Sequence, residues 1–449
     1  MLKKSLLLLI PLTMIYLSYE ELSYHFMNFN EKTINYPQPP SHFVSVQKGH
    51  FFVNNKPYYF LGANFWSAMN LASKGAGGDR ERLVRELDYL QSLGIKNLRI
   101  MAASEGPNTE PWRAVPAVQT SPSVYDEELL DGLDFVLAEM GKRGMYAVMV
   151  LNNYWPWTGG MAQYQAWFSD TKQIPYPPPA EGGNWLTYMR FSSRFFKNKK
   201  AIAAYQEYIK MLVFRQNNYT GLPYKDDPTI FSWQLANEPR GVLVGNAYYR
   251  WVKNTARFIK KLDSNHLVSV GSEGNAVVPF SRKFKKEHYF KEIDYTTAHI
   301  WAQNWTWYDP TQPEKDFEKS LGKAKKYLRN HIQMAEKLGK PIVLEEFGLA
   351  RDMGSYDSTS STKWRDQYFR ELFTMTYELA KEKRAIAGCN IWAWSGEGRP
   401  QHPKAVWKME DDFTGDPPFE HQGWYSVYDT DSSTLELCQE FAGKMEGLK

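Results

Sequence analysis

The sequence has very little cysteine and no block of charge of one sign, and both absences narrow the class of protein. Only two cysteines, Cys389 and Cys438, occur among 449 residues, so at most one disulfide can form and a hydrophobic core must supply the stability. We expect two free thiols. Lys and Arg number 54 against 50 Asp and Glu, and the net charge of +4 is too small to indicate a nucleic-acid partner.

Signatures of metal and nucleotide sites are also missing. The nine histidines show no ligand spacing such as His-Glu-x-x-His, which argues against a zinc hydrolase. No glycine-rich phosphate loop follows the first expected strand. We therefore expect neither a metal nor a cofactor.

No hydrophobic run is long enough to span a membrane comfortably. The N-terminus reads Met-Leu-Lys-Lys followed by an apolar run from Leu6 to Leu17, which is the pattern of a secretory signal. Residues 1–19 are interpreted as a signal peptide or N-terminal anchor, with cleavage left open. Residues 20–42 predict a polar, proline-containing tether. The protein is expected to be secreted or periplasmic, or membrane-anchored through the first segment alone.

What the sequence does contain, from residue 43 onward, is an alternation of strand-like and helical patterns. Strands are predicted over residues 58–64, 96–101, 145–151, 229–236, 267–271, 294–299, 341–346 and 386–393. Helices are predicted over residues 79–92, 126–143, 200–216, 247–262, 282–291, 316–338, 362–382 and 434–444. Eight strands, each followed by a helix, predict an α/β fold, namely a single (β/α)8 TIM barrel domain over residues 43–449.

Aromatic residues make up 15% of the chain, with 16 Trp, which is more than a core usually needs. The longest segments between predicted elements, residues 102–125, 152–198 and 394–433, follow strands two, three and eight. They carry Trp112, Trp155, Trp157, Trp167, Trp185, Trp407 and Trp424. Because the loops after the strands build the active face of such a barrel, we expect these rings to line an open substrate cleft.

Two predicted strands end in carboxylates. Trp233-Gln-Leu-Ala-Asn-Glu-Pro-Arg240 closes the fourth strand and Ile342-Val-Leu-Glu-Glu-Phe-Gly348 closes the seventh. Strands four and seven lie across an eight-stranded barrel from one another, so Glu238 and Glu346 point into the same mouth. Retaining hydrolysis of a glycosidic bond needs two such carboxyl groups, roughly 5–5.5 Å apart.

On these motifs the chain resembles glycoside hydrolase family 5, on the side of the endo-β-1,4-mannanases, from about Phe43 to the C-terminus. The resemblance implies that Glu238 is the acid/base and Glu346 the nucleophile. Glu345 is a rival for the second role. Adjacent strand residues face opposite ways, so only one of Glu345 and Glu346 is expected to enter the barrel mouth.

The resemblance also implies residues that bind substrate or orient the glutamates: Arg99, Asn237, His299, Trp301, Trp392, Arg240, Asn153 and Trp155. Arg99 would hold the nucleophile ionised, and Asn237 would reach the 2-hydroxyl of the sugar unless it is only a turn former. Trp392 would form the floor beneath the sugar. Arg240 would contact the leaving-group side, or else form a salt bridge at a helix start. Trp301 departs from the family pattern, where a Tyr is expected, so the second orienting group stays open.

These observations favour endo-acting hydrolysis of β-1,4-mannosidic linkages in mannan, glucomannan or galactomannan. A β-1,4-glucanase of the same fold and a non-catalytic polysaccharide-binding barrel are the alternatives. The expected partner is a β-mannan polysaccharide or oligosaccharide. Subsite number, tolerance of galactose branches, transglycosylation and oligomeric state stay open.

Overall fold

A parallel barrel sheet forms the centre of the computed structural model, which describes residues 43–275 and 282–448. The eight-stranded sheet has the order β10-β9-β8-β5-β4-β13-β12-β11. Its strands are β4 (Phe60–Asn64), β5 (Asn97–Met101), β8 (Tyr146–Val150), β9 (Ile230–Gln234), β10 (Leu267–Ser269), β11 (Thr296–Ile300), β12 (Ile342–Phe347) and β13 (Ile386–Ile391). Each overlaps one predicted strand, and the predicted (β/α)8 fold is confirmed.

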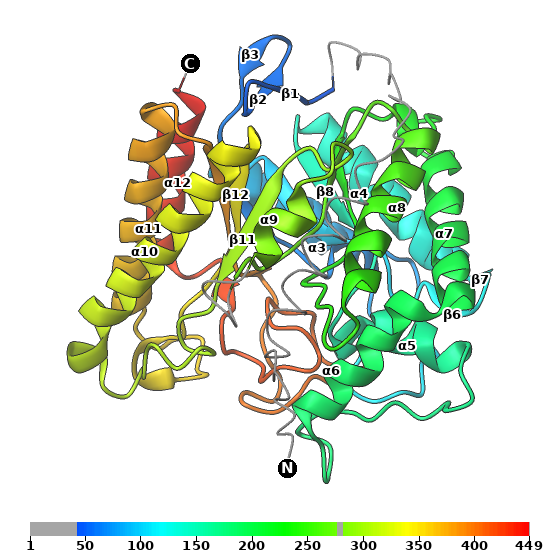
Figure 1. Cartoon of the computed structure of the whole chain (residues 1–449). Helices are drawn as coiled ribbons and strands as arrows, with labels where there is room; N and C mark the ends of the chain where they lie inside the picture. The colour runs from blue at the N-terminus through cyan, green and yellow to red at the C-terminus, as the bar shows by residue number, and fades with distance from the viewer. Residues whose placement is uncertain (1–42, 276–281, 449) are drawn as a thin grey trace, which may run out of the picture. The chain divides into compact units, whose positions relative to one another are not determined.

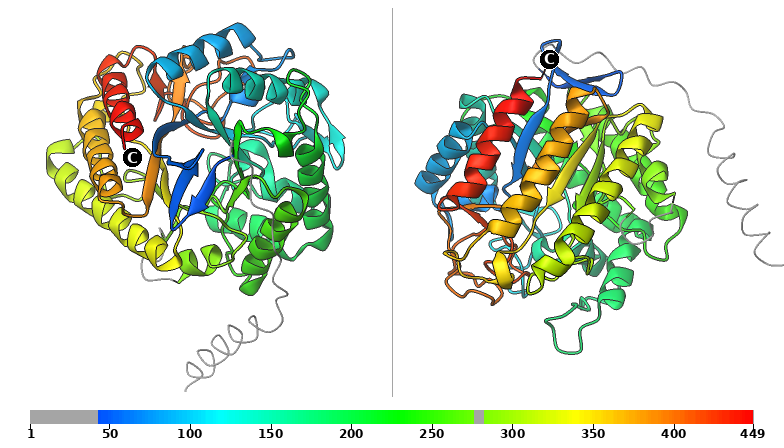
Figure 2. Two further views of the ribbon diagram at one scale, coloured as in Figure 1. Left: turned by 90° about the horizontal axis from the view of Figure 1, so that it is seen from above. Right: turned by 90° about the vertical axis from the view of Figure 1, so that its left-hand side faces the viewer.

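Helices surround the barrel, as the view from above shows (Figure 2). The helices that match predictions are α3 (Arg80–Ser92), α4 (Glu127–Lys142), α7 (Lys199–Phe214), α8 (Asn246–Leu262), α9 (Lys283–His288), α10 (Pro313–Leu338), α11 (Lys363–Lys381) and α12 (Ser432–Glu446). Local sequence fixes where several begin. The side chain of Asp79 accepts the backbone N–H of Arg82 at the start of α3, and Asp126 caps α4 in the same way.

The barrel strands are buried on both faces. All residues of β4, β5 and β9 to β13 are buried. Polar side chains on these strands, such as Arg99 of β5 and Glu346 of β12, must therefore find their partners inside the barrel.

A small antiparallel sheet covers the end of the barrel at which the strands begin. It consists of β1 (Ser45–Gln47), β2 (His50–Val53) and β3 (Lys56–Pro57), and it lies at the opposite end of the molecule from α5 and α6 (Figure 1). Asn54 and Asn55 form the turn with φ of 50° and 62°, a conformation that Asn tolerates well. Phe51 packs edge-on against Phe231 at 5.1 Å and Tyr295 at 5.3 Å between ring centroids.

The long loops contain short elements that the sequence analysis did not predict. They are α2 (Ala68–Leu71), α5 (Gly160–Trp167), α6 (Trp185–Ser193), β6 (Gln119–Ser121), β7 (Val124–Tyr125), β14 (Trp394–Gly396) and β15 (Val427–Tyr428), with 3-10 turns η1 (Pro156–Thr158), η2 (Arg194–Lys197), η3 (Tyr224–Asp226) and η4 (Asp352–Gly354).

The interpretations of residues 1–19 and 20–42 lie outside the described residues. Within residues 43–275 and 282–448, no helix combines the length and apolar character needed to cross a membrane. Cys389 and Cys438 are buried free thiols, as expected.

Candidate active site

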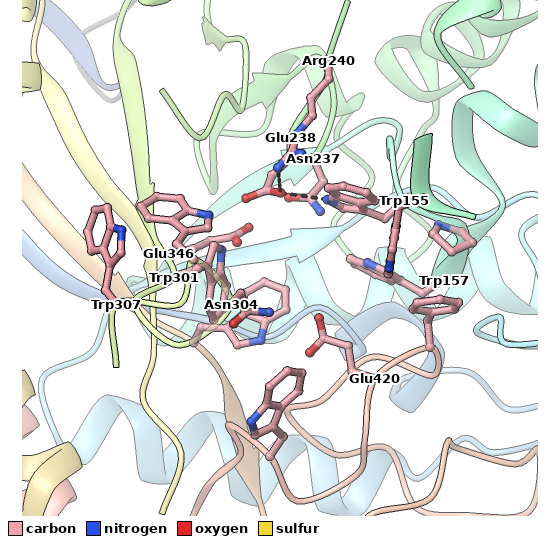
Figure 3. A pocket seen from close by; sticks show the side chains of 16 residues that line it. Trp155, Trp157, Asn237, Glu238, Arg240, Trp301, Asn304, Trp307, Glu346 and Glu420 are labelled. Atoms are coloured by element: carbon pink, nitrogen blue, oxygen red, sulfur yellow. Dashed lines mark hydrogen bonds and ion pairs between the residues drawn. The ribbon is translucent and has the colours of Figure 1, made fainter. Parts of the chain in front are cut away.

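Glu238 and Glu346 face one another at the mouth of the barrel (Figure 3). Glu346 belongs to β12, and Glu238 lies four residues beyond the end of β9. One carboxylate oxygen of each, together with a ring nitrogen of His299, lie within 4.8 Å of one another. That spacing suits a retaining glycosidase and is too short for an inverting one, whose carboxyl groups are roughly 6.5–9.5 Å apart. Glu238 has a φ of 48°, a strained conformation of the kind that concentrates at functional sites.

Arg99 on β5 lies beneath the glutamates, and its side chain is 3% exposed. Its Nη1 donates a hydrogen bond to Glu346 Oε1, and its Nη2 donates to Asn237 Oδ1 at 2.8 Å. Its Nε donates to Gln234 Oε1 at 2.8 Å. Burial alone would lower the pKa of Arg99, but the adjacent carboxylates raise it above its ordinary value. Arg99 is therefore a permanent positive charge against the predicted nucleophile.

His299 on β11 bridges the carboxylates. Its Nδ1 lies 2.7 Å from Glu238 Oε1 and 3.2 Å from Glu346 Oε2, and its Nε2 lies 3.4 Å from Glu345 Oε2. Burial alone would lower the pKa of His299, but Glu346 and the hydrogen bonds to Glu238 and Glu345 raise it well above its ordinary value. The ring is therefore protonated and donates from both nitrogens.

The environment makes Glu238 more acidic than an ordinary carboxyl group. Burial alone would raise its pKa, but the hydrogen bond and charge of His299, the charge of Arg240 and the indole of Trp155 lower it to about 2. Trp155 Nε1 donates to Glu238 Oε2 at 2.8 Å. A general acid must carry a proton, so this ionised state differs from the one expected. Of the two groups that donate to Glu238, only His299 carries a proton that it can transfer, because the indole of Trp155 does not ionise.

Glu346 lines the pocket at the barrel mouth and Glu345 does not, but the alternation of strand faces from which this was expected does not hold. Along the β11–β12 pairing, Ala298 is opposite Leu344 and His299 is opposite Glu346, so Glu345 is an extra, bulged residue. The bulge breaks the alternation of faces on which the expectation depended.

Glu345 consequently reaches the barrel interior as well. Its Oε1 accepts a hydrogen bond from Gln234 Nε2 at 2.8 Å, and its Oε2 lies 3.5 Å from Arg99 Nε. Burial alone would raise the pKa of Glu345, but Arg99 and His299 lower it. Glu345 does not line the pocket. Its contacts with Gln234, Arg99 and His299 place it in a charge network below the two facing glutamates.

A pocket of about 590 Å³ opens above these carboxylates. Its lining residues are Trp155, Pro156, Trp157, Trp185, Asn237, Glu238, Arg240, Trp301, Asn304, Trp305, Trp307, Glu346, Trp392, Phe419, Glu420 and Trp424. Of the tryptophans that the sequence placed in a cleft, Trp112, Trp167 and Trp407 are not among them.

Three predicted site residues, Arg99, His299 and Asn153, lie behind the pocket lining. Asn153 is completely buried, and its Oδ1 accepts from the backbone N–H of Trp155 at 3.0 Å and from Asn237 Nδ2 at 3.2 Å. Its contacts are those of a residue that orients Asn237 rather than one that touches a sugar.

Arg240 extends from the end of the Asn-Glu-Pro segment along the pocket wall. Its Nη2 donates to Glu273 Oε2 at 2.6 Å and lies 3.8 Å from Glu238 Oε2. Its guanidinium is 4.7 Å from the ring centroid of Trp155. Arg240 thus forms a salt bridge, although not at a helix start, since α8 begins at Asn246, and it also lines the pocket. Its contact with a sugar stays a prediction.

Trp301 packs edge-on against Trp392, with ring centroids 5.5 Å apart, and lies 5.2 Å from Tyr425. Tyr425 comes from the loop after the eighth barrel strand, and its hydroxyl donates to Asn304 Oδ1 at 2.6 Å. Trp301 therefore belongs to an aromatic wall, and the indole that donates to Glu238 is that of Trp155.

Sequence reasoning missed several lining residues: Pro156, Asn304, Trp305, Trp307, Phe419 and Glu420. The run Trp301-Ala-Gln-Asn-Trp-Thr-Trp307 after the sixth strand was a readable signal for three of them. Glu420 has no comparable pattern around it.

Glu238, His299 and Glu346 could by distance alone hold a metal ion. However, both carboxylates already accept hydrogen bonds from cationic partners, Arg99 and His299. A cation at this point would be repelled by the Arg99 guanidinium, so the donor set fits an acid/base pair better than a metal.

Comparison with known proteins supports the same reading. A model described as GH family 5 beta-mannosidase-like matches residues 41–449. The chain belongs to this family. It is therefore a glycoside hydrolase, and the resemblance read from its motifs is confirmed.

The relatives are mannan-degrading enzymes by name. The chain is 31% identical over 371 residues to mannan endo-1,4-beta-mannosidase 5 of Solanum lycopersicum, covering 79% of this chain and 82% of the relative. The glycoside hydrolase family 5 mannosidase of Rhizomucor miehei has a similar structure, with a TM-score of 0.85 and 36% identity over 91% of this chain and 98% of that one. The endo-1,4-beta-mannanase of the same fungus, at 22% identity and a TM-score of 0.66, shows the shared fold.

Proposed function

We propose that the protein is an exported retaining hydrolase that cleaves β-1,4-mannosidic linkages within mannan, glucomannan or galactomannan. The observation that carries the proposal is the pair of carboxylates, Glu238 and Glu346, with oxygens within 4.8 Å beneath an aromatic pocket. The names of the relatives support mannan as substrate, and one structure of the Rhizomucor miehei mannosidase holds mannosyl-fructose.

In the first step, Glu346 attacks the anomeric carbon while Glu238 gives a proton to the leaving oxygen. The bond from carbon to that oxygen breaks, and a glycosyl ester of Glu346 forms. In the second step, Glu238 takes a proton from water, which attacks the same carbon and releases Glu346. Arg99 holds the charge of Glu346 before and after the ester exists, because its Nη1 bonds directly to that carboxylate.

The proton for the first step comes from His299. Its Nδ1 lies 2.7 Å from Glu238 Oε1, which is a hydrogen-bond distance along which a proton can pass. When a sugar displaces water from the pocket, the ionised form of Glu238 loses solvation and the proton moves to it.

The direct test replaces each glutamate by its neutral isostere. Glu238→Gln and Glu346→Gln should each lower turnover of purified mannan by roughly a thousandfold or more while mannobiose binding persists in calorimetry. Glu410→Gln, an exposed carboxylate, is the matched control and should behave as wild type. Wild-type turnover in both site variants would end the proposal.

A second candidate is a mannosidase that prefers short saccharides. It is favoured by the ring contacts that join the loops after the third and eighth strands, because Trp185 packs edge-on against Phe419 at 5.6 Å. The products from mannan and from mannobiose distinguish the two, since chain-end attack releases small sugars without an early fall in polymer length. Carboxymethylcellulose in the same assay tests the β-1,4-glucanase alternative.

Export is part of the proposal and depends on residues 1–19, with their charged start and short apolar run. A fusion of these residues to a reporter enzyme should carry the reporter out of the cytoplasm, either released or anchored to the membrane. A reporter that stays in the cytoplasm would contradict export.

A further inference from the structure

Glu420 is a third carboxyl group in the pocket, and the mechanism above does not use it. It lies in the segment between β14 and β15, after the eighth barrel strand. Figure 3 shows its carboxyl group pointing into the cavity. Its Oε2 is buried and, among the described residues, has no hydrogen-bond partner. A buried polar atom without a partner is costly, which makes an atom of the ligand its natural partner.

The backbone around Glu420 is held firmly from within its own loop. The carboxylate of Asp416 accepts the backbone N–H groups of Gly423 at 2.9 Å and Tyr425 at 2.7 Å. The side-chain amide of Gln422 donates to the backbone carbonyl of Glu420 at 3.3 Å. These bonds fix the chain on the C-terminal side of Glu420.

The preceding residue anchors the same loop to its neighbours. Phe419 packs edge-on against Trp185 at 5.6 Å and Trp112 at 6.2 Å, and these rings come from the loops after the third and second barrel strands. Glu420 is thus presented to the pocket by a backbone fixed on both sides, which is the arrangement that preorganised binding groups need.

The surroundings of Glu420 favour the neutral form of its carboxyl group. Burial, followed by repulsion from Asp416, Glu346 and Glu238, raises its pKa well above the usual value. No ion pair joins it to a cation within residues 43–275 and 282–448. A neutral carboxyl group offers one O–H donor and one carbonyl acceptor, which is the pair of functions that a sugar hydroxyl complements.

We propose that the Glu420 carboxyl group hydrogen-bonds a hydroxyl of the bound saccharide and is a specificity-determining residue of this pocket. The inference rests on the proposed function and deepens it. The aromatic walls provide stacking surface that tolerates many sugars, whereas a buried polar group rejects a ligand that leaves it unpaired.

Two variants separate hydrogen bonding from shape and charge. Glu420→Gln keeps a donor and an acceptor and should hold KM for mannotetraose, which both candidate activities would cleave, within about threefold of wild type. Glu420→Leu keeps the bulk but neither function, and KM should rise about tenfold while kcat changes less. Glu410→Leu, an exposed glutamate of the same segment, is the control and should leave both constants unchanged.

Monodeoxy analogues of mannotetraose identify the partner hydroxyl. Wild type should lose about tenfold in kcat/KM on one analogue, and Glu420→Leu should lose nothing further on that analogue, because the contact is already absent. Two results would overturn the role of Glu420 but leave the proposed function standing. One is an unchanged KM in Glu420→Leu. The other is that, on every analogue, the loss from the missing hydroxyl and the loss from Glu420→Leu multiply as independent effects do. A wild-type protein that cleaves neither mannobiose nor mannan would overturn the proposed function, and this inference with it.

Discussion

At the residue scale, the carboxylate of Glu238, the proposed acid/base, is surrounded by donors. His299 binds one oxygen and Trp155 the other, and both stabilise the ionised form. The pKa of Glu238 therefore depends on these hydrogen bonds as well as on burial. Each donor can be removed separately by mutation.

Replacing Trp155 by Phe removes one donor and keeps an aromatic ring beneath Arg240. The pKa of Glu238 then rises, because the indole N–H no longer stabilises the carboxylate. In a pH titration of the carboxyl groups followed by NMR, Glu238 should therefore titrate about 1–2 pH units higher than in wild type, the equivalent of one hydrogen bond to a charged group. Trp157→Phe is the control, since no hydrogen bond joins that pocket-lining indole to either glutamate within the described residues. A pKa of Glu238 that stays in place, or falls, would count against the role of Trp155.

Sequence reasoning worked for residues that sit in local motifs at strand ends. Glu238, Glu346 and Arg99 could be placed because strand direction alone carries them to the barrel mouth. Glu345 could not, since its inward position comes from a bulge in the pairing of two strands far apart in sequence. Glu420 was invisible because only the folding of a long loop brings it to the pocket.

At the element scale, the loops after β5 and β8 are joined edge to edge. The backbone N–H of Glu105 donates to the carbonyl of Thr158 at 2.6 Å, and that of Ala114 donates to the carbonyl of Trp157 at 2.8 Å. The side chain of Glu105 accepts the backbone N–H of Gly160 at 2.7 Å. Through these bonds the loop after β5, which carries neither Glu238 nor Glu346, holds Trp157 in the loop after β8 in place.

Glu105 makes the stability of this loop pair depend on pH. Burial raises its pKa to about 8. Between pH 4.5 and 8 the folded protein keeps a proton that the unfolded chain releases, so the contribution of Glu105 to stability falls as pH rises through that window. Gln still accepts from Gly160 but does not titrate. The Tm of Glu105→Gln, relative to wild type, should therefore increase steadily from pH 5 to pH 8.

Thermal unfolding at four pH values measures this difference, with Glu318→Gln, an exposed carboxylate on α10, as control. A Tm difference that is the same at every pH would show that Glu105 does not titrate in this range.

The short elements in the loops could not be predicted because tertiary contacts define them. Helix α5 begins at Gly159 and Gly160, with φ of 87° and 57°. A Cβ on Gly160 would lie 2.1 Å from the carbonyl oxygen of Asn153, so only glycine permits this close approach. No apolar period of its own marks the helix in the sequence.

At the scale of the whole molecule, the eight-fold repetition of strand and helix made the fold predictable. An error of one or two residues at a boundary, as at β9, leaves the count of strands and the order of elements unchanged. The predicted position of the site is equally insensitive to such errors, because the order of the barrel strands, rather than the exact boundary of any one strand, brings Glu238 and Glu346 together.

The small antiparallel sheet of β1 to β3, here called the hairpin, should matter to the stability of the whole fold, whereas residues 1–37 should not. Phe51 is 1% exposed and covers Phe231 and Tyr295 at the barrel end remote from the active site. Phe51→Ala should cost about 3–5 kcal/mol in the free energy of unfolding, because the ring leaves a cavity and uncovers two others. Near wild-type stability in this variant would show that the barrel closes without the hairpin.

Two truncations test the same argument on the intact active site. A chain that begins at Gln38 keeps the hairpin and every site residue, so its Tm and its turnover of mannan should match those of the full chain. A chain that begins at Tyr58 loses β1 to β3 and exposes aromatic rings at the start of the strands, so it should unfold at lower temperature and lose activity through instability. If the shorter chain were as stable as the longer one, the hairpin would be an appendage and the barrel alone would be the folding unit.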